Sequence, residues 1–167
     1  MKIRQYEPKD LDSIIELFQQ TVYNINRQDY SANQVNAWVN STTKSKRYSK
    51  WAQEFGQNFT YVAEEEGEVV GFIDMTAAGY LDRLYVHHHF QRVGIATLLL
   101  SEIEATAQKH KLYKLTTKAS ITARPFFEAQ RFQTIKKQTV EISDLKITNF
   151  VMEKKLNFFR GNSSVKI

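Results

Sequence analysis

The segment from Val86 to Thr97 combines residue types that could bind a phosphate group. A β-rich run ends at Val86, a loop follows, and an amphipathic helix begins with Gly94 and Ala96 at alternate positions. The first turn of a helix exposes unpaired N–H groups, and the helix dipole adds positive potential, so a pyrophosphate can bind there. Gly94 and Ala96 would let the anion approach the backbone, and Arg92 adds a positive charge. The spacing alone also fits an ordinary small-residue helix start packed on a sheet.

Two aspartates precede this loop and could act as a general base. Asp82 lies on the β-rich run that enters the loop, and the period of two along a strand predicts that it shares a face with Leu84 and Val86. A carboxylate there could accept a proton from a reacting group, or it could be an ordinary strand carboxylate paired with Lys or Arg. Asp74, on the preceding β-rich run, is the second candidate.

Metal and thiol chemistry have little support. The chain has no cysteine, which excludes a disulfide, a thiol nucleophile and a Cys-ligated metal. The tract from His87 to His89 looks like a metal site, but adjacent residues leaving a strand point to different sides, and no carboxylate follows at a helical spacing. We therefore expect no metal site and interpret the tract as a solvated loop or a contact to phosphate groups.

The first half of the chain should form one strand and two helices before the sheet proper begins. A short alternating run predicts a strand over Lys2 to Tyr6. One helical face is marked by Leu11, Ile14, Ile15, Phe18 and Val22. Ser31 suits the N-cap of a second helix, and a third, weaker helical stretch covers Ser49 to Phe55. The polar, basic residues 41–50 are expected to form a loop.

The remaining pattern predicts an α+β domain. Strands are expected over Phe59 to Ala63 and Val69 to Met75, joined by a hairpin turn at Gly67, and over Tyr80 to Val86. A long helix begins near Val93. The later elements are a strand over Lys114 to Lys118, a helix over Ile121 to Ala129, and a closing β pair over Gln133 to Ile142 and Lys146 to Lys154. The order βααβββαβαββ predicts a mixed, mostly antiparallel central sheet flanked by helices.

The composition fits one folded domain. Of the 167 residues, 42% are apolar and 25% are charged, which suits a sizeable core and is unlike a disordered chain. We expect a single domain over residues 1–156 and leave residues 157–167 as a tail of unknown role. No apolar run approaches the roughly 20 residues of a membrane span, and no signal peptide is recognisable, so we expect a soluble, cytoplasmic protein without a membrane partner.

Positive charge is concentrated in the second half of the chain. Residues 1–83 carry 9 basic and 12 acidic side chains, whereas residues 84–167 carry 14 and 6. Such a surplus fits nucleic acid, a phosphorylated cofactor or a solvated surface. A nucleic-acid-binding module has only this charge in its favour, because no zinc finger, ribonucleoprotein pattern or helix-turn-helix is evident, and we expect no nucleic-acid partner.

Two segments closely resemble the GNAT (Gcn5-related) N-acetyltransferase superfamily. Gln91, Gly94 and Ala96 occupy the positions of its acetyl-CoA-binding pattern Q/R-x-x-G-x-G/A, after a strand that ends in valine. Residues 120–132, SITARPFFEAQRF, align without a gap with the pattern N-x-x-A-x-x-F-Y-E-x-x-G-F. The expected order of elements also matches the superfamily over residues 1–156.

The resemblance implies an N-acetyltransferase that transfers the acetyl group of acetyl-CoA to a primary amine of a small molecule or peptide, by direct attack in a ternary complex. Strand backbone groups would hold the pantetheine arm and thioester carbonyl, and the following turn would hold the pyrophosphate. The cofactor-binding residues implied are Leu84, Tyr85, Val86, Gln91, Arg92, Val93, Gly94, Ile95, Ala96, Thr97, Ser120 and Phe127. Asp82 would be the catalytic base, because an amine of pKa about 10 is mostly protonated at neutral pH.

The chain departs from the family pattern at several positions. Phe127 stands where many relatives have the tyrosine that protonates the coenzyme A sulfur, and phenylalanine cannot donate that proton. Because a thiol of pKa about 8.5 leaves tolerably as a thiolate, we expect slower rather than abolished transfer, or substitution by water or another tyrosine. Ser120 replaces the usual asparagine, and His88 a common proline. Phe127 also motivates the alternative of a non-catalytic acyl-CoA-binding or sensor module.

The acceptor is left open by the sequence. Aromatic residues cluster in the helical region that forms one wall of the acceptor pocket in the resembling family: Tyr23, Tyr30, Trp38, Trp51 and Phe55. They are either core residues or an aromatic pocket wall. Four basic residues are expected on a solvated loop rather than at a site for phosphate or an acidic peptide: Lys44, Lys46, Arg47 and Lys50. A monomer and a homodimer are equally compatible with the sequence.

Overall fold

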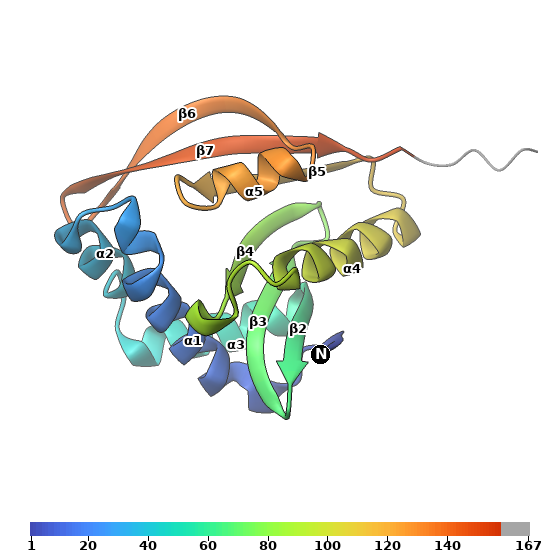
Figure 1. Ribbon diagram of the computed structural model, residues 1–167, viewed down its shortest axis with the longest axis horizontal. Helices are drawn as coiled ribbons and strands as arrows, with labels where there is room; N and C mark the ends of the chain where they lie inside the picture. Colours follow the sequence, from blue (N-terminus) through green and yellow to red (C-terminus); the bar gives the residue numbers. More distant parts are fainter. Residues whose placement is uncertain (158–167) are drawn as a thin grey trace, which may run out of the picture.

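A computed structural model describes residues 1–157 of the chain. One seven-stranded sheet has the order β1-β2-β3-β4-β5-β7-β6 (Figure 1). Its strands are β1 (Lys2–Gln5), β2 (Phe59–Glu65), β3 (Glu68–Met75), β4 (Tyr80–Val86), β5 (Lys114–Ser120), β6 (Gln133–Ile142) and β7 (Leu145–Lys155). The α-helices are α1 (Leu11–Asn24), α2 (Ala32–Val39), α3 (Lys44–Gln57), α4 (Ile95–Lys109) and α5 (Arg124–Ala129). Short 3-10 helices are η1 (Pro8–Asp10), η2 (Asn26–Gln28) and η3 (His88–Phe90).

The expected α+β class and mostly antiparallel sheet are confirmed. All neighbouring strands pair antiparallel except β4 and β5, which are parallel. Ser31 caps α2 as expected, since its side chain accepts a hydrogen bond from the Gln34 N–H at 3.1 Å. Within residues 1–157, every helix is too short or too polar to cross a membrane.

The expected loop over residues 41–50 is wrong from Lys44 onward, because α3 begins there. Thr43 provides the N-cap by accepting a hydrogen bond from the Lys46 N–H at 3.2 Å. Arg47, Trp51 and Phe55 follow at steps of four residues and form the buried stripe of the helix. The stripe was missed because its first member is an arginine, whose charge disguises the helical periodicity. The chain therefore has three α-helices between β1 and β2, one more than expected.

The sheet separates two apolar clusters. Buried residues on the α4 face include Ile73, Leu81, Ile95, Leu99 and Ile103. Buried residues on the face covered by α1, α2 and α3 include Ile14, Phe18, Trp51, Phe55 and Phe72. Neighbouring β3 residues thus contribute to opposite clusters, as the alternation of a strand requires. Burial of each such side chain contributes about 1.5–3 kcal/mol, so these clusters fix the strands that carry the site.

β4 and β5 separate after a very short pairing. Only Tyr80 with Thr116 and Leu81 with Thr117 are partners in this parallel pair. The hydroxyl of Thr117 donates to the Leu81 carbonyl at 3.0 Å and secures the last paired position. Beyond it the two strands diverge, so that β1–β4 and β5–β7 form the two arms of the sheet (Figure 1).

A β-bulge in β4 coincides with this point of divergence. Asp74 pairs with Arg83, but the next β3 residue, Met75, pairs with Leu81, so Asp82 has no partner on β3. An extra residue of this kind bends the strand and redirects its side chain, and such bulges often stand beside active sites. Asp82 therefore lies directly after the last β4–β5 pair, where the two arms of the sheet separate.

Two glycines should respond to alanine substitution with opposite signs. At Gly79, φ is +87° and an added Cβ would lie 2.6 Å from the Lys114 carbonyl oxygen, whereas a Cβ at Gly56 in α3 meets nothing within 4 Å. Gly79→Ala is expected to lower the free energy of unfolding by about 1–3 kcal/mol through backbone strain and overlap. Gly56→Ala is expected to raise it by up to about 1 kcal/mol. Urea unfolding followed by circular dichroism measures the free energy of unfolding of both variants. Changes of the same sign in the two variants would contradict this prediction.

Candidate active site

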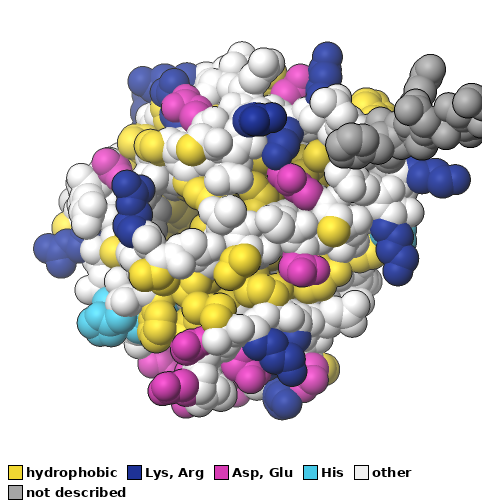
Figure 2. All heavy atoms as spheres, turned by 45° about the vertical axis from the view of Figure 1, so that its right-hand side comes forward, with side chains coloured by type: hydrophobic (Ala, Val, Ile, Leu, Met, Phe, Trp, Pro, Cys, Tyr) yellow, Lys and Arg dark blue, Asp and Glu magenta, His cyan; other side chains and the backbone are white. Residues whose placement is uncertain are grey.

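A cavity of about 500 Å³ opens where β4 and β5 diverge. Its lining includes Asp82 and every predicted cofactor-binding residue except Val93. Val93 is 63% exposed and does not line this cavity. In Figure 2, hydrophobic side chains line a hollow on the face shown, and basic side chains stand near its edge. The structure thus brings two segments distant in sequence, residues 82–97 and 117–127, to one cavity.

The N-terminus of α4 faces this cavity with its amide groups uncapped. Gly94 is the N-cap, has a φ of +90° and makes no side-chain cap. The first α4 residues, Ile95 to Thr97, line the cavity. Arg92 also has a positive φ, +64°, and its exposed side chain lies at the same edge. This arrangement suits an anion such as a diphosphate, as the residue pattern predicts.

Gln91 shapes the turn that leads to α4. Its side-chain amide donates to the Val86 carbonyl at 2.7 Å and to the His87 carbonyl at 3.3 Å. The Thr21 hydroxyl of α1 donates to the same Val86 carbonyl at 3.0 Å. Gln91 therefore closes the loop on itself and fixes the start of the helix, in addition to lining the cavity.

The backbone of β4 presents polar groups to the gap. The His87 N–H donates to the Val70 carbonyl at 2.9 Å and extends the ladder with β3. Because bonded residues alternate along an antiparallel pair, the backbone groups of Tyr85 point to β3, whereas those of Leu84 and Val86 point to the cavity. Of the three predicted strand residues, two thus offer backbone groups, and Tyr85 offers its side chain.

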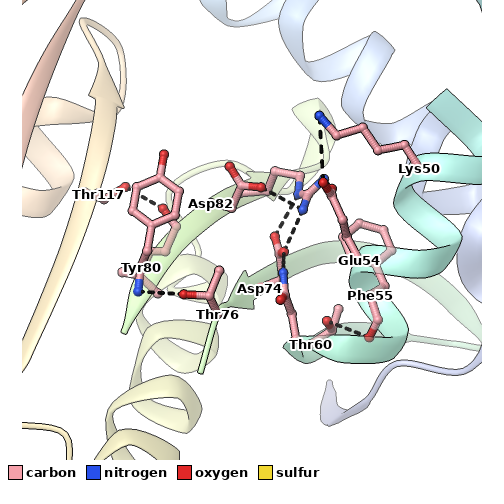
Figure 3. Close-up of polar contacts among 12 residues, drawn as sticks. Lys50, Glu54, Phe55, Thr60, Asp74, Thr76, Tyr80, Asp82 and Thr117 are labelled. Atoms are coloured by element: carbon pink, nitrogen blue, oxygen red, sulfur yellow. Dashed lines mark hydrogen bonds and ion pairs between the residues drawn. The ribbon is translucent and has the colours of Figure 1, made fainter. Parts of the chain in front are cut away.

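A cluster of charges surrounds the guanidinium of Arg83. Asp74 accepts hydrogen bonds from its Nε and Nη2 at 2.9 and 2.8 Å, Glu54 of α3 accepts from Nη1 at 2.7 Å, and Asp82 lies 2.8 Å from Nη2. Figure 3 shows these three carboxylates converging from β3, α3 and β4. Asp74 is fully buried and also accepts from the Asn58 amide at 2.7 Å. Both Asp74 oxygens thus already accept hydrogen bonds, and Asp74 lines neither this cavity nor the one that adjoins it.

Asp82 does not share the face of Leu84 and Val86, and the period-of-two expectation fails there because of the bulge. Leu84 and Val86 pack in the cluster on the α4 face, whereas the Asp82 carboxylate lies against Arg83, which bonds α3. Asp82 is nevertheless 37% exposed at its side chain and lines the cavity. Burial raises the pKa of Asp82 above its ordinary value, and the favourable charge of Arg83 only partly opposes this. The Asp82 carboxylate is thus both paired with an arginine and accessible from the cavity.

A second cavity, of about 640 Å³, adjoins the first. The two share five lining residues: Trp38, Asp82, Arg83, Tyr85 and Lys118. Phe18 of α1 and Trp51 of α3 add to the aromatic wall of the second cavity. Of the five aromatic residues singled out from the sequence, Trp38 and Trp51 line this cavity. Asp82 stands at the junction of the two cavities, where a group bound in one would meet a group bound in the other.

The other predicted aromatic residues have different roles. Tyr30 is buried, and its hydroxyl donates to the Thr148 carbonyl at 2.7 Å and accepts from the Ile121 N–H at 2.8 Å. Phe55 lies in the core, and Tyr23 is 39% exposed. None of the three lines the second cavity.

Phe127 and Ser120 complete the β5 side of the first cavity. Phe127 is only 3% exposed and packs edge-on against Phe132, with ring centroids 5.0 Å apart. The Ser120 hydroxyl accepts a hydrogen bond from the Ala123 N–H at 3.0 Å and shapes the turn before α5. Both residues have clear structural roles, and neither supplies a proton donor where the family pattern places its tyrosine.

The histidine tract belongs to the turn before α4. His87 accepts a hydrogen bond at Nδ1 from the His89 N–H at 3.2 Å, and its Nε2 lies 3.2 Å from a side-chain oxygen of Gln20. Burial and the neighbouring imidazoles lower the pKa of His87. Over residues 1–157, no group of three or more His, Cys, Asp or Glu side chains is placed to hold a metal ion.

Sequence reasoning missed two arginines of the site. No role was predicted for Arg83, although it lies in the expected strand Tyr80 to Val86, directly before Leu84. Arg47 was placed on a solvated loop, yet it is 4% exposed and lines the second cavity. Its spacing of four to Trp51, with a threonine N-cap before it, was the available signal.

Comparisons with known proteins agree with this geometry. A family model described as an acetyltransferase (GNAT) domain matches residues 26–156. The chain is 34% identical over 155 residues to YafP, an uncharacterized N-acetyltransferase of Escherichia coli K12, with 93% of this chain and 96% of that protein covered.

Solved structures share the fold. A GCN5-related N-acetyltransferase from Rhodopseudomonas palustris is 27% identical, with a TM-score of 0.86 over 93% of this chain and 95% of that one. The PaiA N-acetyltransferase of Thermoplasma acidophilum, solved in complex with coenzyme A, is 20% identical, with a TM-score of 0.73 over 93% and 98% of the two chains. Together with the divergent strands, the uncapped helix start and the family match over most of the chain, these likenesses mean that the chain belongs to the GNAT family of N-acetyltransferases.

Proposed function

We propose that the protein transfers the acetyl group of acetyl-CoA to a primary amine within a ternary complex. The observation that carries this proposal is the pair of adjoining cavities with Asp82 at their junction. One cavity has the donor features of the family, and the other has an aromatic and charged wall suited to an acceptor. Direct transfer needs both reactants in contact, and this arrangement provides such a meeting point.

The residues of the first cavity fit acetyl-CoA. The uncapped amides of α4, with Arg92 beside them, would hold the diphosphate. The Leu84 backbone groups and the Val86 N–H, which face the gap, would bind the pantetheine arm, and one of these N–H groups would stabilise the oxyanion that develops at the thioester carbonyl. Acetyl-CoA supplies the activated acyl group, and the chain supplies its orientation.

Asp82 would act as the base that removes a proton from the amine. The pKa of Asp82 is raised and therefore lies closer to neutral pH than that of an ordinary aspartate, which makes its carboxylate a better general base near neutral pH. Arg83 fixes the carboxylate in place through the 2.8 Å ion pair. The attack forms the amide N–C bond and breaks the C–S bond, and coenzyme A leaves as a thiolate because Phe127 offers no proton.

Calorimetric titration of acetyl-CoA, followed by a thiol-release assay with a panel of primary amines, tests this proposal. Micromolar binding and amine-dependent release of coenzyme A are expected. Binding without turnover on any amine would favour the second candidate, a non-catalytic acyl-CoA sensor, which the phenylalanine at position 127 supports. Absence of binding would reject both.

A further inference from the structure

Arg47 is buried in the wall of the second cavity and has no carboxylate partner within residues 1–157. Its side chain is 4% exposed, and its guanidinium carbon lies 5.1 Å from the ring centroid of Phe18 and 5.9 Å from that of Trp51. Its one polar side-chain contact within residues 1–157 is with the Ser41 hydroxyl, at a long 3.4 Å. Burial accordingly lowers the pKa of Arg47.

In the part of the chain that the structure describes, the other two largely buried arginines are paired with carboxylates. Arg83 bonds the carboxylates of its cluster, and Arg4 bonds Asp10 at 2.8 Å and Glu64 at 2.7 Å. A buried charge without a counter-ion costs free energy, because the protein interior replaces hydration poorly. Stacking on two aromatic rings offsets only part of that cost. The exception at Arg47 therefore needs an explanation, and it occurs in the wall of a cavity.

The cavity around Arg47 is lined by more basic than acidic side chains. Among the described residues that line it, Asp82 is the single acidic one, against Lys46, Arg47, Lys50, Arg83 and Lys118. Arg83 is neutralised by its own cluster, and Lys50 lies 3.8 Å from Glu54. The hydroxyls of Ser41 and Thr42 also line the cavity and can donate to an anion. An anionic group is the ligand that would complete this wall.

Asp82 and Arg47, which carry opposite charges in the second cavity, differ in their relation to the first cavity. Asp82 lines both cavities, whereas Arg47 lines only the second. An acceptor whose amine reaches Asp82 next to the donor would therefore extend its remainder toward Arg47. Resting on the function proposed above, we propose that the acceptor is a small amine that also carries an anionic group, a carboxylate or a phosphate, which Arg47 binds. The aromatic wall between these ends would contact the acceptor's carbon skeleton.

Matched pairs of amines test this inference. Each pair consists of an anionic amine and its neutral counterpart: L-phenylalanine with phenethylamine, L-tryptophan with tryptamine, and phosphoethanolamine with ethanolamine. For each pair, kcat/KM of the anionic amine is divided by kcat/KM of the neutral amine. This ratio is measured in the original protein, in Arg47→Met and in the control Lys44→Met. The control removes an exposed charge of the same helix that does not line the cavity. Comparing ratios between variants cancels the difference in basicity between the two amines of a pair.

Arg47→Met is expected to reduce the ratio for at least one pair by about tenfold or more, the worth of one charge-assisted hydrogen bond. Lys44→Met should leave every ratio within about twofold, since a surface charge outside the cavity is screened. A carboxylate ligand predicts the effect in the amino-acid pairs, and a phosphate ligand predicts it in the phosphoethanolamine pair. An equal loss for both members of every pair would mean that Arg47 has only a packing role and would overturn the inference.

Two further measurements keep this test independent of folding and of catalysis. Acetyl-CoA affinity within about threefold of the original identifies a folded variant, and Arg47→Lys, which keeps the charge, should retain part of the preference. Calorimetry with N-acetyl-L-phenylalanine and N-phenethylacetamide in the presence of coenzyme A needs no turnover. Preferential binding of the acid that is lost in Arg47→Met would support the anion site even if no amine were acetylated, whereas acetylation that favours neutral amines irrespective of Arg47 would refute the anion site and leave the proposed function standing.

Discussion

Replacing Thr97 by glutamate is expected to weaken acetyl-CoA binding at least about a hundredfold without unfolding the protein. Thr97 is the third residue of α4, is exposed, and lines the first cavity. A carboxylate there would stand where the diphosphate is proposed to bind. At an effective dielectric constant of about 20, two like charges about 4 Å apart repel by about 4 kcal/mol, more than the roughly 2.7 kcal/mol that a hundredfold change requires.

The stability of this variant should be preserved because an acidic residue in the first turn of a helix is favourable. Leu98→Glu is the matched control, since Leu98 is 47% exposed, follows directly in the same helix and does not line the cavity. At physiological salt the control should bind acetyl-CoA within about fivefold of the original protein, because separated exposed charges are screened. Calorimetry on both variants decides the matter, and equal affinities for the two would place the diphosphate elsewhere.

Asp82→Asn is expected to lower kcat by about 10²–10³, the usual contribution of a general base. Asparagine keeps an oxygen that can accept the hydrogen bond from Arg83, so the affinity for acetyl-CoA should stay unchanged. Because the ionised carboxylate has a raised pKa, its charge opposes folding above that pKa, and the variant should be at least as stable as the original protein near neutral pH.

The pH dependence separates a catalytic role from a structural one. The base works when ionised, so kcat/KM of the original protein should rise with pH through the raised pKa of Asp82. In Asp82→Asn this rise should disappear, and only the limb due to deprotonation of the amine itself should remain. An unchanged kcat, or an unchanged profile with a lower kcat, would contradict the assignment of Asp82 as the base.

The donor side of the site was largely predictable from sequence because its chemistry is local. The turn from Gln91 to Ala96 needs a strand, small residues and a helix start in one short segment, and each of these has a recognisable pattern. Leu84 and Val86 follow from the same segment by strand alternation. The exposed side chain of Val93 is the exception, and it occurs where the turn directs one residue outward.

The acceptor side was hidden because it depends on tertiary structure. The direction of Asp82 is set by a bulge in the pairing of β4 with β3, and the β4 sequence alone does not predict this bulge. Arg47 belongs to a helix whose buried stripe begins with a charged residue, and its unusual environment exists only once α1 and α3 pack together. Sequence periodicity identifies apolar stripes well, but it does not predict that an arginine is buried in the wall of a binding cavity.

The two cavities are lined largely by different segments of the chain, and this has an evolutionary consequence. Six of the seven residues that line only the second cavity lie between Ser41 and Trp51, whereas the first cavity is lined chiefly by residues of β4, β5, α4, α5 and the turns beside them. Under the function proposed above, acceptor recognition and donor binding are therefore encoded largely by different parts of the gene. Substitutions within residues 41–51 can change which acceptor is recognised while the residues of the first cavity stay the same, so new acceptor specificities can evolve through changes in one short segment.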